Sequence, residues 1–442
     1  MGARDRVPAV AMALFMAACG GGDPISPQGL PAPAVATSVE LNNTAVTLLP
    51  ADSVLITAVV RDQYGAPMAG QAVTWSISDG TVASVDGGAV KALATGTATI
   101  TAMTGAASAI SAVTVQADDR TAYLWANDPS SASYSPSATY EHLSSGGHAT
   151  ITRSGVGSYS VSLPGLGATG AQRTNVQISA SGTGPAFCKS AGWTSAGADL
   201  TVQVRCFEAG GAPADTRFTL LALGGTALGG RYGALLATDP AAAAPYQPVD
   251  ARSSRGDSVI VIRTAPGDYL VRMPGLKRAG ADGPEQVLVT AVGEGTQRCW
   301  VRGWTPDRFE VNVGCGDATG QSADSRFSLV VLDQGRPGRN MAFAWANDPE
   351  AAAPYAPDAN YSYNSANLAN EITRNGVGSY SVIFSGMTRT TGAAETFIVS
   401  AHSNGALACR IGSWGNTISV SIFCYDSAGA LADASFDLVM IQ

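Results

Sequence analysis

The strongest constraint on this chain is a sequence block that occurs three times after residue 117. The segment "YLWANDPSSASYSP" returns as "ALLATDPAAAAPYQP" and "FAWANDPEAAAPYAP", and "ITRSGVGSYSV" returns as "VIRTAPGDYLV" and "ITRNGVGSYSV". Each copy repeats these segments in the same order, and each copy is long enough to form a hydrophobic core of its own. The sequence therefore predicts three related domains, at residues 118–225, 226–335 and 336–442.

Each block reads as a series of short β-strands. Apolar and polar residues alternate over short runs, and Gly, Asn or Pro separates the runs. The longest helix-like stretch is the Ala-rich "PAAAAP" that begins at Pro240. Charged residues make up only 14% of the chain, which is typical of secreted all-β proteins. We expect an all-β fold in which each repeat is a two-sheet sandwich or a jelly-roll-like barrel.

Six of the seven cysteines occur as two per repeat. Six cysteines allow 15 pairings, and the repeat symmetry selects one of them. The predicted disulfides are Cys188 with Cys206, Cys299 with Cys315, and Cys409 with Cys424. Such bridges indicate an oxidising compartment. Zinc binding is the alternative, but two cysteines without paired histidines fall short of four ligands. We therefore predict no metal site and no cofactor.

Residues 36–117 form a different module with the same period-two alternation. The segment from Val73 to Ala102, "VTWSISDGTVASVDGGAVKALATGTATITA", resembles the group 2 bacterial immunoglobulin-like domain of invasins and intimins. The resemblance implies a small β-sandwich that serves as a stalk or spacer. It also implies that Trp75 lies in the core, and it implies no binding site.

The N-terminus has the pattern of a secretory signal. Arg4 and Arg6 precede an apolar run that ends at Ala18 and is too short to span a bilayer. The residues "MAAC" that end at Cys19 resemble the lipobox of bacterial lipoproteins, which implies cleavage before Cys19 and a lipid on its sulfur. The alternative is a plain signal peptide with an incidental cysteine. Residues 20–35 read as a Gly/Pro tether.

These N-terminal features predict that the protein is located in the bacterial cell envelope. Its partner there is the membrane, which it binds through the lipid on Cys19. Gly20 after the cysteine favours the outer membrane or the cell surface by resemblance to other lipoproteins. The net charge of −8 and the absence of any basic block argue against nucleic-acid partners.

No catalytic constellation is visible in the sequence, so we predict that the protein is not an enzyme. The three histidines, His142, His148 and His402, do not align between repeats. GxSxG and HExxH motifs are absent. Two acidic positions do recur, and they are Asp128, Asp239, Asp348 and Asp215, Asp324, Asp433. They fit Asp side chains that cap turns, and calcium binding by these carboxylates is the open alternative.

Three sets of aromatic residues recur with the repeats. Tyr159, Tyr269 and Tyr380 lie inside strands and are predicted to be core residues. Trp193, Trp304 and Trp414 lie between the paired cysteines, where packing is expected and a ligand platform is the alternative. Tyr134, Tyr246 and Tyr355 precede a proline in a loop, and they are the candidate ligand surface.

The sequence thus predicts a lipid-anchored envelope or surface protein that presents tandem β-sandwich domains for adhesion, or for binding a protein or a glycan. Repetition favours binding, because several weak sites on one tether gain avidity. Two alternatives stay open. One is a passive structural spacer of the envelope, and the other is a glycoside hydrolase with two facing carboxylates.

Overall fold

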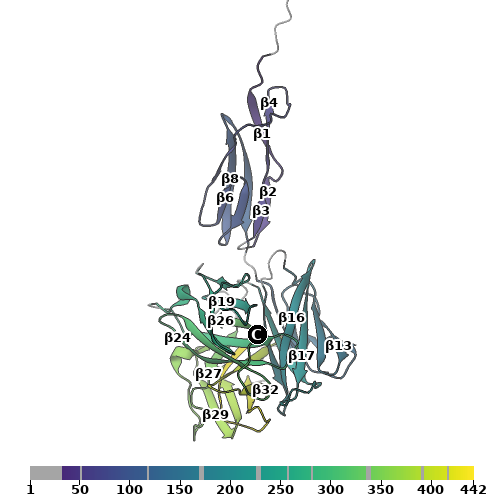
Figure 1. Cartoon of the computed structure of the whole chain (residues 1–442), viewed down its shortest axis with the longest axis vertical. Helices are drawn as coiled ribbons and strands as arrows, with labels where there is room; N and C mark the ends of the chain where they lie inside the picture. The colour runs from purple at the N-terminus through teal and green to yellow at the C-terminus, as the bar shows by residue number, and fades with distance from the viewer. Residues whose placement is uncertain are drawn as a thin grey trace, which may run out of the picture.

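The computed structural model describes residues 32–49, 52–116, 119–168, 174–224, 230–255, 258–279, 282–334, 340–389, 393–415 and 418–442. In these ranges the chain consists of β-strands, turns and three short 3-10 helices. None of the helices in the described part is long and apolar enough to cross a membrane. Figure 1 shows an elongated N-terminal β domain at the top, above a larger β body. The predicted all-β fold is confirmed.

The N-terminal domain is a sandwich of short sheets. Its strands are β1 (Ala36–Leu41), β2 (Ala45–Leu48), β3 (Ser53–Leu55), β4 (Ala58–Asp62), β5 (Thr74–Ile77), β6 (Ala83–Asp86), β7 (Ala89–Ala92), β8 (Gly96–Thr104) and β9 (Ala107–Val115). The sheets have the orders β2-β9-β8-β5, β1-β4 and β3-β7-β6. Ala98, Ile100 and Ala102 of β8 are buried at alternate positions, as the period-two pattern predicts. Trp75 is half-buried and packs against this core.

The larger body contains the three repeats, and each repeat has a similar order of strands. The first has β10 (Thr121–Ala126), β11 (Ser133–Tyr134), η1 (Ala138–Tyr140), β12 (Glu141–Leu143), β13 (Thr150–Gly155), β14 (Ser158–Leu163), β15 (Asn175–Ser181), β16 (Phe187–Ala196), β17 (Asp199–Phe207) and β18 (Arg217–Leu223). The second has β19 (Gly233–Ala237), β20 (Arg252–Ser253), β21 (Ile260–Ala265), β22 (Asp268–Arg272), η2 (Pro274–Leu276), β23 (Gln286–Val292), β24 (Arg298–Thr305), β25 (Glu310–Gly316) and β26 (Arg326–Leu332). The third has β27 (Met341–Trp345), η3 (Ala359–Tyr361), β28 (Ser362–Asn364), β29 (Asn370–Gly376), β30 (Ser379–Phe384), β31 (Thr396–His402), β32 (Ala408–Trp414), β33 (Ser419–Tyr425) and β34 (Ser435–Ile441).

Each repeat is a two-sheet sandwich with its own apolar core, and each has one disulfide. The bridges join directly opposite residues of neighbouring antiparallel strands, β16 with β17, β24 with β25, and β32 with β33. They are the predicted pairs Cys188–Cys206, Cys299–Cys315 and Cys409–Cys424. Loops of 15 to 18 residues of this kind stabilise the fold by roughly 3 kcal/mol each in the chain-entropy model.

The sheets continue from one repeat into the next, which the sequence did not predict. One sheet has the order β12-β10-β18-β15-β32-β33-β30-β29 and therefore joins the first repeat to the third. A second joins β16 to β23, and a third joins β24 to β31. Each junction is a short parallel contact, and the register partners are Ser181 with Ile411, Ser190 with Val292, and Val301 with His402. The three repeats therefore close into a ring.

The closed ring has a fourth core at its centre. This central core collects residues of all three repeats, among them Leu221, Leu288, Phe343 and Ile398. The strands that face it are buried on both sides, so every residue of β15 is buried, whereas β14 alternates between buried and half-buried positions. Strands buried on both faces read as continuous apolar runs, as in "RFTLLAL" and "RFSLVVL".

Three hydroxyl groups join the repeats around the axis of the ring. Ser179 Oγ donates to Val399 O at 3.0 Å and accepts from Val399 N at 2.9 Å. Ser400 Oγ makes the same pair of bonds with Val289, at 3.1 and 2.9 Å. Thr290 Oγ1 accepts from Ile178 N at 3.1 Å. The two serines each satisfy an N–H and a C=O of the neighbouring repeat, and Thr290 satisfies one N–H and donates to the Gln177 side chain at 2.8 Å.

Candidate functional site

In each repeat, the recurrent aspartate before the last strand accepts hydrogen bonds from one arginine, one glycine and one tyrosine of a β-hairpin. Asp433 accepts both guanidinium donors of Arg374, at 3.0 and 2.7 Å, the N–H of Gly378 at 2.9 Å and the hydroxyl of Tyr380 at 3.0 Å. The bond from Arg374 is the main cause that lowers the pKa of Asp433 to about 2. Gly378 has a φ of +63°, and a Cβ there would lie 2.6 Å from Cys424 O, so the turn requires glycine.

The other two repeats contain the same clamp. Its members are Asp215, Arg153, Gly157 and Tyr159 in the first repeat, and Asp324, Arg263, Gly267 and Tyr269 in the second. Each carboxylate is already saturated by these donors, which supports the predicted turn-capping role over calcium binding. The tyrosine rings are buried in the cores, as predicted.

The candidate ligand surface, Tyr134, Tyr246 and Tyr355, lies against the cores of the repeats. All three rings are half-buried and pack on core residues. Their hydroxyls accept the backbone N–H groups of Asp128, Asp239 and Asp348, at 3.1 to 3.2 Å. Burial raises the pKa of Tyr134 and Tyr355 to about 12. These contacts favour a structural role in which the tyrosines stabilise the Asp-Pro turns. They give no support to ligand binding by the rings, which stays a prediction.

A hollow lined by aromatic rings lies at the junction of the second and third repeats. Trp304, Trp345, Tyr361, His402 and Gly303 enclose about 100 Å³. The ring centroids of Trp304 and Trp345 are 6.5 Å apart, and the ring of Tyr361 lies edge-on to both at 5.3 and 5.2 Å. The His402 ring stacks on Trp345 at 5.1 Å. The hollow therefore offers aromatic faces and edges from two repeats to one small ligand.

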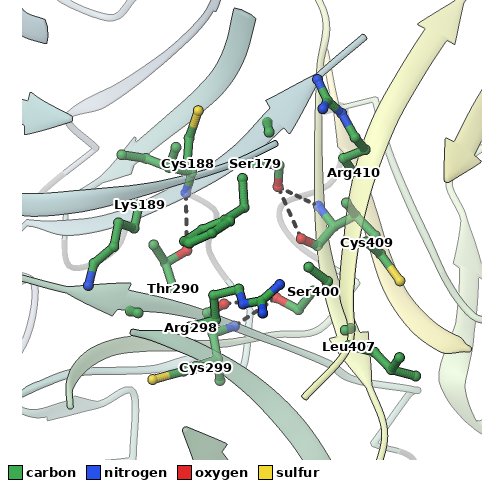
Figure 2. A pocket seen from close by; sticks show the side chains of 18 of the residues that line it. Ser179, Cys188, Lys189, Thr290, Arg298, Cys299, Ser400, Leu407, Cys409 and Arg410 are labelled. Atoms are coloured by element: carbon green, nitrogen blue, oxygen red, sulfur yellow. Dashed lines mark hydrogen bonds between the residues drawn. The ribbon is translucent and has the colours of Figure 1, made fainter. Parts of the chain in front are cut away.

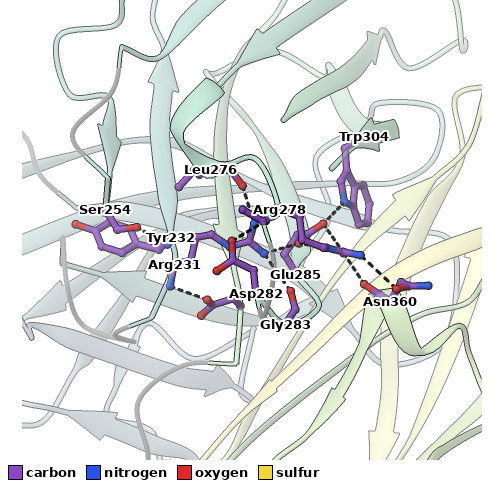
Figure 3. A network of polar contacts seen from close by, with 12 residues as sticks. Arg231, Tyr232, Ser254, Leu276, Arg278, Asp282, Gly283, Glu285, Trp304 and Asn360 are labelled. Carbon is purple, nitrogen blue, oxygen red and sulfur yellow. Dashed lines mark hydrogen bonds and ion pairs between the residues drawn. The ribbon is translucent and has the colours of Figure 1, made fainter. Parts of the chain in front are cut away.

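A buried ionic network fixes one wall of this aromatic hollow (Figure 3). Glu285 is fully buried and accepts from Arg231 at 2.6 Å, from Arg278 at 2.7 Å and from the indole N–H of Trp304 at 3.2 Å. Arg278 also donates to Asn360 O at 2.7 Å, and its guanidinium lies over the Tyr361 ring at 5.4 Å. Two arginines on one carboxylate lock the position of Trp304 and tie it to the third repeat.

His402 forms the other wall, and a buried carboxylate orients it. Its Nδ1 lies 3.1 Å from Asp437 Oδ2, and the Asp437 side chain is fully buried. Burial raises the pKa of Asp437 above its ordinary value, while His402 acts in the opposite direction. The contact fixes the imidazole ring beside Trp345, with its second nitrogen directed away from Asp437.

The junction of the third and first repeats has a tighter version of the same cluster. Trp125 and Trp414 have centroids only 5.1 Å apart, with Tyr140 at 4.8 Å from Trp125. Arg389 and Glu395 support it as Arg278 and Glu285 do at the other junction. At the junction of the first and second repeats, Leu236 occupies the position of Trp125 and Trp345 in the repeat alignment. The three junctions have therefore diverged.

A cavity of about 60 Å³ lies on the axis, where the three repeats meet. Figure 2 shows Ser179, Thr290 and Ser400 around its middle and the labelled cysteines of the three disulfides farther out. Three buried cations line it, Lys189, Arg298 and Arg410. Burial is the main cause that lowers the pKa of Lys189 to about 8 and of Arg410 to about 10.

The axial cavity was not predicted, and of the aromatic hollow only Trp304 was singled out, as one of three tryptophans whose alternative role was a ligand platform. Both are made by residues of different repeats, so no single block contains them. The sequence contained only weak signals of these sites. For the axial cavity, the signal is a charged residue beside Cys188, Cys299 and Cys409. For the aromatic hollow, it is a Trp and a Tyr that only the first and third repeats share. Cys19 lies outside the described residues. Among the residues that the structure describes, no cluster of three or more potential metal ligands is found.

Comparisons with known proteins identify one part of the chain. Residues 35–115 match the family model of the bacterial Ig-like domain (group 2), so this part is such a domain. No curated protein matches the chain. A solved structure of domains 4-9 of the surface layer protein SbsC matches over 92% of this chain, at 12% sequence identity and a TM-score of 0.19. This chain covers 65% of that structure, and a likeness at this level carries no argument about fold or function.

Proposed function

We propose that the chain is a lipid-anchored protein of the bacterial cell envelope, in which the Ig-like domain carries a ligand-binding head made of the three repeats. The lipobox-like residues before Cys19 support the anchor, and the bacterial Ig-like domain at residues 35–115 supports a role in the envelope. The three disulfides agree with an oxidising compartment. In this arrangement the Ig-like domain lies between the anchor and the head in the order of the chain.

The observation that carries the binding function is the aromatic hollow of Trp304, Trp345, Tyr361 and His402. Aromatic faces stack on the apolar faces of sugar rings, and an imidazole beside them supplies a hydrogen-bonding group for a hydroxyl. The proposed ligand is therefore a glycan, bound through one sugar unit at this junction. The buried acids support binding over hydrolysis, because Glu285 and Glu395 are held by arginines and Asp437 by a histidine.

The repeats themselves supply a matched pair of variants that tests this proposal. Trp345→Leu places in the hollow the residue that the second repeat has at this position, Leu236. Trp125→Leu makes the same change in the tight cluster at the other junction. We expect mature wild-type protein to bind a subset of an envelope or host glycan array, Trp345→Leu to lose at least about tenfold in affinity, and Trp125→Leu to keep it.

Two results would count against a glycan-binding head. One is the absence of binding to any glycan by the wild-type protein, which would favour the passive spacer. The other is equal affinity of the wild type and the Trp345→Leu variant, which would place the ligand elsewhere on the body.

A further inference from the structure

The axial cavity brings together three buried positive charges, one from each repeat. Lys189, Arg298 and Arg410 are exposed by only 2%, 5% and 3%, and each is adjacent to a disulfide cysteine in the sequence. Among the described residues, none of the three forms an ion pair with a carboxylate. Buried charges in proteins are normally paired, so three cations gathered around one cavity without an ion pair favour a bound anion there.

Two of these cations are held by main-chain oxygens of the neighbouring repeat. Lys189 Nζ donates to Gly295 O at 2.9 Å. Arg410 donates to Gly184 O at 2.6 Å and to Ala186 O at 3.0 Å. Neutral carbonyl groups satisfy the Lys189 ammonium and part of the Arg410 guanidinium, but they do not cancel the charges. Acids such as Glu294, Asp317 and Glu208 offset part of the positive charge through space without forming ion pairs with the three cations, so the cavity keeps a positive potential.

Arg298 has the most unsatisfied donors of the three cations: two of its nitrogens have no partner in the described part of the chain, against one of Arg410 and none of Lys189. Its one hydrogen bond, from Nη2 to Ala318 O, is 3.4 Å long, and its guanidinium lies 4.9 Å from the centre of the Phe187 ring. Among the described residues, its Nε and Nη1 have no acceptor and are shielded from solvent. Figure 2 shows this guanidinium near the middle of the cavity. Only one long hydrogen bond and one ring contact hold this guanidinium. It can therefore turn its free donors toward an anion without losing a strong interaction.

We propose that the axial cavity is a binding site for an oxyanion, a phosphate, sulfate or carboxylate group, which Arg298 contacts directly and Lys189 and Arg410 attract through their charge. A volume of about 60 Å³ holds a few water molecules, and one small oxyanion has a similar bulk. A guanidinium donates two parallel hydrogen bonds to such a group. The bound anion would hold the three repeats together at the point where they meet.

The site is independent of the proposed glycan site, and its ligand can come from two sources. Either a free inorganic anion fills it, or it takes the anionic group of a larger molecule. Titration calorimetry of the mature protein with phosphate, sulfate, glucose 6-phosphate and glucuronate, at constant ionic strength set with chloride, separates the two. Tight binding of phosphate or sulfate indicates a free anion, and binding of the sugar acids alone indicates a larger ligand.

The decisive variant is Arg298→Met, which keeps the apolar stem on Phe187 and removes the charge. We expect it to weaken anion binding by about 10- to 100-fold. Because it removes a buried unpaired charge, we also expect its melting temperature without anion to equal or exceed that of the wild type, and the order to reverse at saturating anion. Arg272→Met is the matched control, since Arg272 is half-exposed and pairs with Glu310.

Two outcomes would overturn the proposal. The first is that none of the four anions binds or raises the melting temperature of the wild-type protein. The second is that Arg298→Met and Arg272→Met bind and respond to the anions as the wild type does, which would show a general salt effect on an acidic protein.

Discussion

Replacing Ser400 by alanine tests whether the repeats depend on one another through the axis. Ser400 is 5% exposed, and its hydroxyl satisfies both the N–H and the C=O of Val289 in the neighbouring repeat. The Ser400→Ala variant leaves two buried main-chain groups without partners. At roughly 1–3 kcal/mol for each such group, we expect a loss of about 2–6 kcal/mol in the free energy of unfolding of the body.

Ser400→Thr is the matched control, because the second repeat has Thr290 at this position and keeps the hydroxyl. Equilibrium unfolding in urea, followed by tryptophan fluorescence and circular dichroism, measures both variants against the wild type. The Thr variant is expected to lie within about 1 kcal/mol of the wild type. If Ser400→Ala unfolds at the same urea concentration and with the same slope as the wild type, the hydroxyl bonds at the axis do not hold the ring together.

Two further predictions concern the clamp and the closure of the ring. The pKa of Asp433 is lowered to about 2 from 3.8, so the carboxylate stabilises the fold above pH 3.8 and this contribution disappears as the pH falls through about 2. The difference in unfolding free energy between wild type and Asp433→Asn should therefore shrink from pH 5 to pH 2 in urea titrations, and a difference independent of pH would contradict the assignment. Deleting residues 336–442 removes the partners of β15 and β24 and opens the central core. Gel filtration and proteolysis should show a folded Ig-like domain and an aggregated or cleaved remainder, whereas a folded two-repeat monomer would refute the ring as a cooperative unit.

The sequence was sufficient for those features that a single repeat contains. Paired cysteines at matching positions identified Cys188–Cys206 and its two counterparts, since repeat symmetry left one pairing. Period-two alternation identified outer strands such as β14, whose inward residues form the core of one repeat. The segment around Trp75 identified the Ig-like domain.

What the sequence did not predict depends on contacts between repeats. The run "SFDLVMI" of β34 indicates burial on both faces, but it does not say which neighbour covers the second face. The aromatic hollow is hard to find for the same reason, because Trp304 comes from one repeat and Trp345 and Tyr361 from the next. For Tyr134 and its counterparts, the position in a loop before a proline suggested an exposed ring, whereas the ring is half-buried and its hydroxyl accepts a turn N–H; ligand binding by these rings stays a prediction.

Closure of the ring has a consequence for how the chain folds. One sheet edge of the first repeat, strand β15, pairs with β32 of the third repeat. Since β32 comes more than 200 residues later in the sequence, this edge stays unpaired until the third repeat is present. Until that strand has been synthesised and can pair, the open edge and half of the central core face solvent, and both favour aggregation. The three-repeat body therefore assembles late, and factors that shield β-strand edges are expected to help the chain until the third repeat has formed.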